Sequence, residues 1–215
     1  MVNCVPTHLY TETVNQIYVR KMVVIMITIG SERLILRDYR ESDLTEYHKL
    51  MSDKENMYYL YDIITNTVEE SLESLKGTIE VNRSEKARRF CITEKGKGKL
   101  IGAVGYEIPV ITPVGKIADP MGWFIMPEYQ NMGYMTEAVK RVLKFAFLED
   151  NCIRVVTGCF RDNIPTQKVM KKAGFRQEAE KPQAIWLDGQ MRDRLEFAIN
   201  REEYFKMEGI NRTVL

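Results

Sequence analysis

The stretch MGWFIMPEYQNMGYMTEA, residues 121–138, decides the fold, because it leads from a strand pattern through a polar loop into a helix pattern. The apolar run 121–126 predicts a buried strand that ends at Pro127. Beyond Gly133, apolar residues recur at helical spacing and predict a long amphipathic helix. A helix start has unpaired N–H groups and about half a positive charge, which attract phosphate or pyrophosphate. Many α/β crossovers share this pattern. By itself it therefore favours neither a phosphate-binding role nor a purely structural one.

Strand and helix patterns alternate on both sides of this stretch, without repeats or Pro/Ser-rich linkers. Such a mixture predicts one α/β domain with helices on both faces of its sheet. A capping box at Thr67 and Glu70 starts one helix, and Asn163 and Gly174 mark the ends of another. The strands are predicted at 32–37, 89–93, 100–108, 121–126 and 152–160 and in a last hairpin turned at Asp188 and Gly189, and the helices at 42–51, 67–79, 133–147, 163–174 and from Arg201.

Composition narrows the class of protein. The 215 residues fit one ordinary domain, and 31 Lys plus Arg nearly balance 30 Asp plus Glu. Without a basic field, the chain is not expected to bind nucleic acid or a membrane surface. The cysteines, Cys4, Cys91, Cys152 and Cys159, have neither CxxC nor Cys/His ligand spacing. We therefore expect no disulfide, no metal and a cytoplasmic location.

Residues 1–26 are expected to be an extension of the domain, which we place at 27–208 with a short tail at 209–215. The apolar run 23–29 follows two basic residues and so imitates part of a signal peptide. It is too short to span a bilayer and lacks a small-residue cleavage site. Because internal methionines offer alternative starts, one hypothesis is that part of the extension comes from a start codon placed too early.

Three sequence blocks, in the same order, resemble those of one enzyme family. The loop carries Gln130 and Gly133 in the pattern (Gln/Arg)-x-x-G-x-(Gly/Ala), followed by the run TEA at 136–138. NIPTQKVMKKAGF at 163–175 is similar to an N-x-x-S…K-x-G-F block, and DGQMRDRLEFAINREEY at 188–204 to a DG…D…REE(W/Y) ending. Together these blocks resemble the GNAT superfamily of N-acetyltransferases and its Rim-type branch, which acetylates the N-termini of ribosomal proteins and various small amines.

The resemblance implies a mixed, mostly antiparallel sheet of six to seven strands, in which strand 121–126 splays from its parallel neighbour at 152–160. The pantetheine arm of acetyl-CoA lies in that gap and pairs with the backbone as a missing strand would. Loop N–H groups hold the pyrophosphate, and Asn163 bonds the arm or fixes the splay, unless it is a simple N-cap. The residues implied to bind acetyl-CoA are Phe124, Ile125, Met126, Gln130, Asn131, Met132, Gly133, Tyr134, Met135, Thr136, Asn163 and Thr166.

The reaction needs an uncharged amine, because only that form attacks the thioester. At pH 7 the neutral form costs about 4.6 kcal/mol for an amine of pKa about 10.4, and about 1.4 kcal/mol for an α-amine near 8. Asp119, near the head of the central strand, and Glu107, on the neighbouring strand, are the candidates for the base, although isolated acids usually lie exposed. For the acid that reprotonates the CoA thiolate, the resemblance implies Thr166, whose hydroxyl equally suits a helix cap.

Three residues depart from the family pattern. Met135 replaces the last small residue of the loop, which crowds the pyrophosphate or shifts the pantetheine. Met170 stands where many relatives have a tyrosine acid, and Ile185 where some Rim-type members have a glutamate. Together these departures keep open a module that binds acetyl-CoA without turnover. The third argues against activity on protein N-termini.

We expect an enzyme that transfers acetyl from acetyl-CoA to a primary amine and needs no metal. A protein N-terminal α-amine and a small-molecule amine (a polyamine, an antibiotic or an amino acid) both remain open as acceptors, as do a monomer and a homodimer. A cluster of three tyrosines with Trp123 either forms an acceptor wall or packs as half-buried aromatics. The lysines of the 163–174 helix either meet the CoA 3′-phosphate or form a solvated face.

Overall fold

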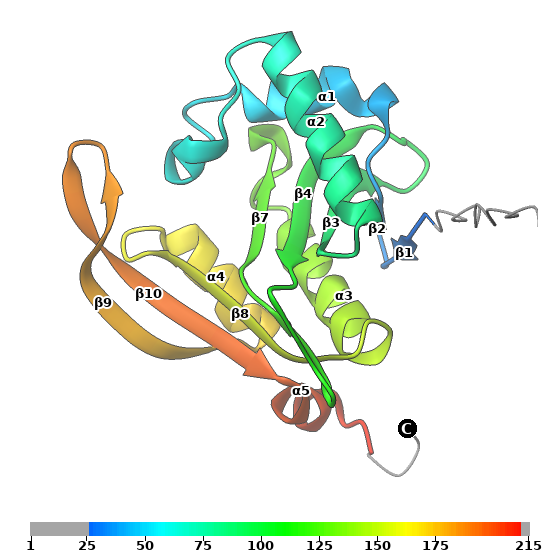
Figure 1. Cartoon of the computed structure of the whole chain (residues 1–215), viewed down its shortest axis with the longest axis vertical. Coiled ribbons are helices and arrows are strands. Elements are labelled where there is room, and N and C mark those ends of the chain that lie inside the picture. Colours follow the sequence, from blue (N-terminus) through cyan, green and yellow to red (C-terminus); the bar gives the residue numbers. More distant parts are fainter. Residues whose placement is uncertain (1–25, 212–215) are drawn as a thin grey trace, which may run out of the picture.

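Two five-stranded sheets form the framework of the computed structural model, which describes residues 26–211 (Figure 1). The first has the strand order β1-β2-β3-β4-β7, and the second has the order β5-β6-β8-β10-β9. Within the described chain the strands are β1 (Thr28–Gly30), β2 (Leu34–Arg37), β3 (Ala87–Glu94), β4 (Leu100–Glu107), β5 (Val110–Thr112), β6 (Gly115–Ala118), β7 (Met121–Ile125), β8 (Cys152–Phe160), β9 (Arg176–Leu187) and β10 (Gln190–Asn200).

Helices cover both faces of the central strands, so the expected α/β fold is confirmed. Figure 1 shows α1 and α2 on the near side of β3 and β4, and α3 on the far side. The helices are α1 (Leu44–Met51), α2 (Val68–Arg83), α3 (Tyr134–Leu148), α4 (Ile164–Ala173) and α5 (Arg201–Glu208), with short 3₁₀ turns η1 (Glu41–Asp43), η2 (Tyr58–Ile63) and η3 (Pro127–Tyr129).

The described chain has more strands than the six to seven expected. The additional elements are β1 and the hairpin of β5 and β6, whose strands have only three or four residues each. Strands this short show no alternation long enough to detect in a sequence. Residues 1–25 of the expected extension and the last four residues of the tail lie outside the described residues.

Two separate cores form on the two faces of the first sheet. On one face α3 packs apolar residues at helical spacing, and Val139, Val142 and Leu143 are fully buried there. On the other face α1 and α2 bury Leu50 and Leu75. The start of α2 is fixed as the sequence predicts, since the Glu70 N–H donates to the Thr67 hydroxyl at 3.1 Å. The hydrophobic stripes of the helices therefore decide which face each helix covers.

The expected splay lies between β7 and β8. β6 pairs with β8 in parallel up to Ala118 and Val155, but β7 pairs with β4 and belongs to the other sheet. The change of partner occurs at the cis bond between Asp119 and Pro120. Beyond it β7 and β8 are held only at their near ends, where the Thr157 hydroxyl donates to the Met121 carbonyl at 2.7 Å. The two sheets consequently diverge and leave a gap.

Candidate active site

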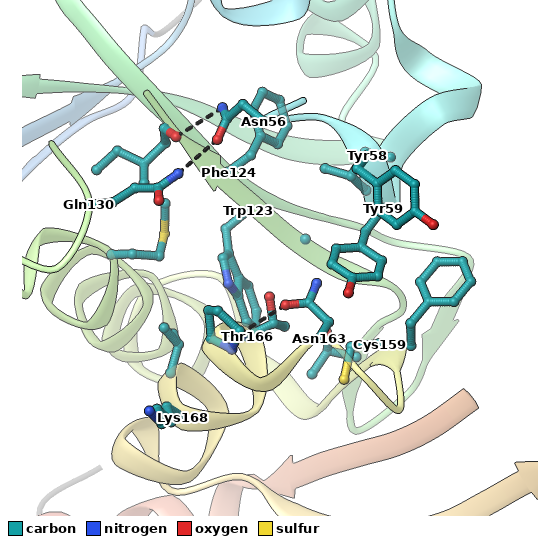
Figure 2. A pocket seen from close by; sticks show the side chains of 18 of the residues that line it. Asn56, Tyr58, Tyr59, Trp123, Phe124, Gln130, Cys159, Asn163, Thr166 and Lys168 are labelled. Carbon is teal, nitrogen blue, oxygen red and sulfur yellow. Dashed lines mark hydrogen bonds between the residues drawn. The ribbon is translucent and has the colours of Figure 1, made fainter. Parts of the chain in front are cut away.

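A cavity of about 1110 Å³ lies where β7 and β8 separate. Its walls come from the segment between α1 and α2, from β7 and the loop that leads to α3, and from the end of β8 with the start of α4. In Figure 2, Tyr58 and Tyr59 lie above Asn163, and Trp123 lies to their left, above Thr166. The splay therefore brings segments that are far apart in the sequence to one space.

The backbone of β7 faces two ways, because the polar groups of successive strand residues alternate in direction. The Met126 N–H donates to the Ile101 carbonyl of the neighbouring backbone at 2.9 Å. Met126 therefore faces the β4 side of the sheet, and so does Phe124 two residues earlier. Of the three residues expected to pair with a pantetheine arm, these two have their backbone groups engaged within the sheet.

The residues that alternate with them face the gap. The Met121 carbonyl accepts the Thr157 hydroxyl bond, and the Ile125 carbonyl accepts from Asn56 Nδ2 at 3.1 Å. Both acceptors lie on the side of β7 away from β4. By the same alternation, the N–H and carbonyl of Trp123 and the N–H of Ile125 point into the cavity. The backbone of Trp123 thus faces the cavity together with that of Ile125, although the sequence did not single out Trp123 for this.

The loop after β7 prepares the start of α3. Gly133 is its N-cap residue, with a left-handed φ of 79°. The Glu137 N–H is the one that reaches back to the Gly133 carbonyl, at 3.1 Å. The N–H groups of Tyr134, Met135 and Thr136 precede it, so they have no partner within the helix. All three residues line the cavity, and free N–H groups at a helix start are able to bind an anion.

Met135 does not obstruct this end. Its side chain packs into the core under α3 and is only 8 % exposed. The Met135 side chain therefore occupies space in the protein interior, and the expected crowding of a ligand at the helix end does not arise. Met132, in contrast, is 53 % exposed and does not line the cavity, although Gln130, Asn131 and Gly133 do.

Glu137, in the TEA run, fixes the helix start from outside the cavity. Its carboxylate accepts from the Ser31 hydroxyl, the Arg33 N–H and Arg33 Nε, each at 2.7 Å. Arg33 Nη1 also donates to the Met132 carbonyl at 3.0 Å, and its guanidinium lies 4.4 Å from the centre of the Tyr134 ring. Burial opposes ionisation of Glu137, but these hydrogen bonds outweigh it and hold the pKa below its usual value.

Asn163 and Thr166 meet at the start of α4. The Thr166 N–H donates to Asn163 Oδ1 at 3.2 Å, so Asn163 is the N-cap that the sequence allows. Both residues also line the cavity. The Thr166 hydroxyl has no hydrogen-bond partner within residues 26–211, which leaves it able to meet a ligand. Met170, one turn further on, is fully buried and takes no part in the site.

Neither of the two candidates for the base, Asp119 and Glu107, is among the residues that line the cavity. Glu107 accepts from Arg89 Nε at 2.9 Å and from Arg89 Nη2 at 2.5 Å, between the neighbouring strands β4 and β3. The Asp119 N–H donates to the Glu107 carbonyl, at the bend before β7. The structure therefore places the two acids near one another and outside the cavity lining.

Other carboxylates do line the cavity. Asp53, Glu55 and Asp62 all come from the segment between α1 and α2, which also supplies Tyr58 and Tyr59. Acids and tyrosines are mixed over residues 53–62 between two helices, but exposed loops often have this composition. No periodicity distinguishes them, so the sequence pattern could not single them out.

Aromatic packing supports the same wall. Tyr59 lies 5.0 Å from Tyr58, edge to face, and 5.3 Å from Phe160 at the end of β8, measured between ring centres. Burial and the nearby Asp162 raise the pKa of the Tyr59 phenol. Cys159 also lines the cavity, and burial raises the pKa of its thiol to about 11, so it is a neutral thiol at pH 7.

Cations line the part of the cavity opposite these acids. Lys168 and Lys172 come from α4, and Arg194 from β10, whereas Lys171 does not line the cavity. The lining is therefore acidic along the segment between α1 and α2 and basic along α4 and β10. A ligand with a negative end and a positive end fits such a division.

A family model described as an acetyltransferase (GNAT) domain matches residues 33–176, more than half of the chain. The chain belongs to the GNAT acetyltransferase family. It is therefore an acyltransferase, an N-acetyltransferase that uses acetyl-CoA. Its sequence is 29 % identical over 176 residues to the uncharacterized N-acetyltransferase YnaD of Bacillus subtilis, covering 82 % of this chain and 98 % of that one.

Solved GNAT structures share the fold. An acetyltransferase from Bacillus anthracis superposes with a TM-score of 0.70 at 27 % identity, over 82 % of this chain and 99 % of that one. RimL, a ribosomal L7/L12 alpha-N-protein acetyltransferase in complex with coenzyme A, gives 0.73 at 21 %, over 82 % and 99 %. A spermidine N-acetyltransferase from Vibrio cholerae, in complex with CoA and spermine, gives 0.70 at 23 %, over 80 % and 98 %.

The GNAT cosubstrate suits the donor side of the cavity in this chain. The gap-facing backbone of β7 offers donors and an acceptor for an extended arm, and the free N–H groups of α3 suit a pyrophosphate. Among residues 26–211, no group of His, Cys, Asp or Glu side chains is arranged to hold a metal ion. No helix in this part of the chain has both the length and the apolar character needed to cross a membrane.

Proposed function

We propose that this GNAT enzyme transfers the acetyl group of acetyl-CoA to the primary amine of a positively charged acceptor, which enters the cavity along residues 53–62. The observation that carries this proposal is the set of three carboxylates, Asp53, Glu55 and Asp62, in the cavity wall. Carboxylates on one side of a cavity favour a cation there by direct Coulomb attraction. They are also able to take up the proton that the amine loses.

On the donor side, we place the pantetheine arm along Trp123 and Ile125 and the pyrophosphate at the first N–H groups of α3. The thioester carbonyl then lies near the Ile125 N–H, which stabilises the oxyanion that forms when the amine attacks. Collapse of this intermediate breaks the carbon–sulfur bond and releases the CoA thiolate. The Thr166 hydroxyl is our candidate for the donor that protonates it, because the hydroxyl has no other partner in the described chain.

A carboxylate of the cavity wall removes the proton from the incoming ammonium, directly or through a water molecule. The task is larger for an alkylamine than for an α-amine, at about 4.6 against about 1.4 kcal/mol at pH 7. Several acids close together help with both binding and deprotonation, which supports an alkylamine with more than one positive charge. Asp119 and Glu107 have no part in this proposal, since they do not line the cavity.

A small polycationic amine is the acceptor that we favour over a protein N-terminus. Ile185 of β9 lines the cavity, at the position where some Rim-type enzymes have a glutamate. An apolar residue there offers nothing to an α-ammonium group, whereas Asp53, Glu55 and Asp62 lie on the other wall. GNAT relatives of both kinds exist, and the lower deprotonation cost keeps the peptide α-amine as the second candidate.

Thiol release from acetyl-CoA, followed spectroscopically with an amine panel, tests the proposal. The panel holds polyamines, amino acids, and peptides with free or blocked N-termini. We expect polyamines to react fastest, and Glu55→Gln and Asp62→Asn each to raise the KM for the amine about twofold to fivefold, as for one partly screened ion pair. Glu73→Gln, an exposed acid of α2 outside the cavity, is the matched control. CoA binding without thiol release from any amine contradicts the reaction, and faster turnover of free peptides contradicts the favoured acceptor.

A further inference from the structure

One carboxamide joins the acceptor side of the cavity to its donor side. Asn56 lies in the segment between α1 and η2, among the acids that line the acceptor wall. Its Nδ2 donates to the Ile125 carbonyl at 3.1 Å, and its Oδ1 accepts from Gln130 Nε2 at 2.7 Å (Figure 2). Both ends of the carboxamide are therefore engaged, one with the splayed strand and the other with the loop that begins α3.

The backbone around Asn56 holds this carboxamide in place. The Asn56 N–H donates to Asp53 Oδ1 at 3.0 Å, and the Met57 N–H donates to the Asp53 carbonyl at 2.9 Å. The Met57 side chain is fully buried in the core between α1, α2 and the sheet. Asn56 is thus attached to the acceptor segment at a fixed point, and a shift of its side chain would shift the segment with it.

The two partners of Asn56 belong to different parts of the donor site. Ile125 presents its N–H to the gap, where the thioester is placed, and Gln130 is at the start of the loop that leads to the helix N-terminus. A ligand that draws the loop toward its phosphates changes the position of Gln130. Because Gln130 and Ile125 meet at the same side chain, that change reaches the acceptor segment directly.

We propose that Asn56 is a positioning residue that couples the two halves of the cavity, so that binding of acetyl-CoA orders residues 53–63 for the acceptor. This inference rests on the proposed function, because it takes the cavity to hold acetyl-CoA on one side and the amine on the other. It makes the affinity for the amine depend on prior binding of acetyl-CoA. This role of Asn56 was not predictable from the sequence, because Asn56 belongs to no motif.

Two substitutions of nearly equal size separate the two hydrogen bonds. Asn56→Asp keeps the acceptor for Gln130 Nε2 but places a carboxylate oxygen against the Ile125 carbonyl. Gln130→Glu removes the donor to Asn56 Oδ1 and leaves the bond to Ile125 in place. Glu128→Gln is the matched control: Lys49 Nζ and Glu128 Oε1, 2.7 Å apart, also join α1 to the segment after β7, but on the exposed surface. An exposed ion pair of this kind contributes little.

The experiment measures amide hydrogen exchange of residues 53–63 with and without CoA, with CoA binding followed by calorimetry. In the wild-type protein and in Glu128→Gln, we expect CoA to slow this exchange by about tenfold, as for a segment that gains order. In Asn56→Asp and Gln130→Glu we expect this slowing to be lost. At saturating acetyl-CoA, the KM for the amine should rise about tenfold in both variants while kcat changes less, the effect of one lost hydrogen bond in a partly buried site.

Three outcomes overturn the inference. If CoA binds to the wild-type protein and exchange of 53–63 does not slow, the coupling is absent while the proposed function stands. Slowing that persists in both variants assigns the coupling to other contacts. If Asn56→Asp fails to fold, Gln130→Glu on the exposed loop gives the answer alone. If CoA does not bind the wild-type protein, the inference and the proposed function both fail.

Discussion

Gly133 and Gly189 have similar backbone dihedral angles, but only Gly133 lies beside the cavity. Comparing the two therefore separates the effect of backbone strain from an effect on the donor site. Their φ angles are 79° and 75°, a region that other residues adopt only with strain. A side chain at Gly133 would begin 3.4 Å from Arg33 Nη2, at the helix end that faces the cavity, whereas a side chain at Gly189 would meet open space in the turn between β9 and β10. Only Gly133 therefore combines backbone freedom with a place at the donor site.

We predict that Gly133→Ala raises the KM for acetyl-CoA about tenfold or more, because a methyl group and its strain displace the backbone N–H groups from the pyrophosphate. Gly189→Ala carries a comparable cost of about 1 kcal/mol in backbone strain but should leave this KM unchanged. Steady-state kinetics with a reactive amine, together with thermal unfolding of both variants, makes the comparison. Equal effects of the two substitutions on the KM would show that the loop does not hold the cosubstrate.

Single residues were predicted from the sequence where a local rule decided them. Thr67 and Asn163 cap their helices as expected, because a cap depends on the neighbouring three residues. Asp119 and Glu107 do not line the cavity, because Asp119 lies in the bend before β7 and the Glu107 carboxylate pairs with Arg89, and neither arrangement follows from a local pattern. Asn56 could not be expected at all, since its partners are 69 and 74 residues away.

At the scale of elements, the start of α3 is held by the turn between β1 and β2. Ser31 and Arg33 bind the Glu137 carboxylate across more than one hundred residues of sequence. The Glu137 side chain is 16 % exposed and the Arg33 side chain 43 %, so solvent screens the Arg33 contacts in part. The strand pair thus fixes the position and direction of the helix end that receives the pyrophosphate in our proposal. The glutamate of the TEA run thus has a structural role, the anchoring of α3 to the β1–β2 turn, which the family resemblance did not indicate.

We predict that Glu137→Gln lowers the free energy of unfolding in a pH-dependent way. The pKa of Glu137 is lowered in the folded state, so the wild-type carboxylate adds stability above its ordinary value of 4.5 and loses it as the pH falls through the lower folded pKa. The difference between wild type and variant should therefore be constant near neutral pH and shrink below 4.5. Urea unfolding from pH 7 to pH 3 measures it, and a difference that grows toward low pH would contradict the assignment.

At the scale of the whole molecule, Asp150 joins the two sheets at the closed end of the splay. This buried carboxylate accepts from Arg88 Nη2 at 3.0 Å, from the Tyr106 hydroxyl at 2.8 Å and from Lys116 Nζ at 2.5 Å. Arg88 and Tyr106 belong to β3 and β4 of the first sheet, and Lys116 to β6 of the second. Burial together with the adjacent carboxylate raises the pKa of Tyr106 far above its ordinary value. The gap therefore opens from a point at which the sheets are tied.

We predict that Asp150→Asn lowers the free energy of unfolding by about 3 kcal/mol, because it leaves the buried Arg88 guanidinium and the partly buried Lys116 ammonium without their counter-ion. The neighbouring Glu149→Gln is the control, since its pair with Arg141 is 46 % exposed on the acid side and should contribute less than about 1 kcal/mol. Urea denaturation of the two variants checks this. A small effect of Asp150→Asn would show that the sheets are tied by apolar packing alone.

The overall fold was predictable to the extent that long apolar patterns determine it. The stretch 121–138 gave the central strand, the loop and α3, and the three family-like blocks gave the order of the remaining elements. The division into two sheets was not predictable in detail, because the short strands β1, β5 and β6 have no pattern of their own. Of the cavity lining, the donor side was predictable from the sequence and the acceptor side was not. The donor side lies in one continuous segment, whereas the acceptor side depends on how a loop folds back over β7.

A crystal structure of the protein with bound acetyl-CoA tests the central claim most directly. We predict that the pantetheine arm lies in the gap between β7 and β8, with its amides bonded to the backbone of Trp123 and Ile125 and its pyrophosphate at the N–H groups of Tyr134 to Thr136. Pantetheine bound outside this gap, or phosphates held away from the start of α3, would contradict it.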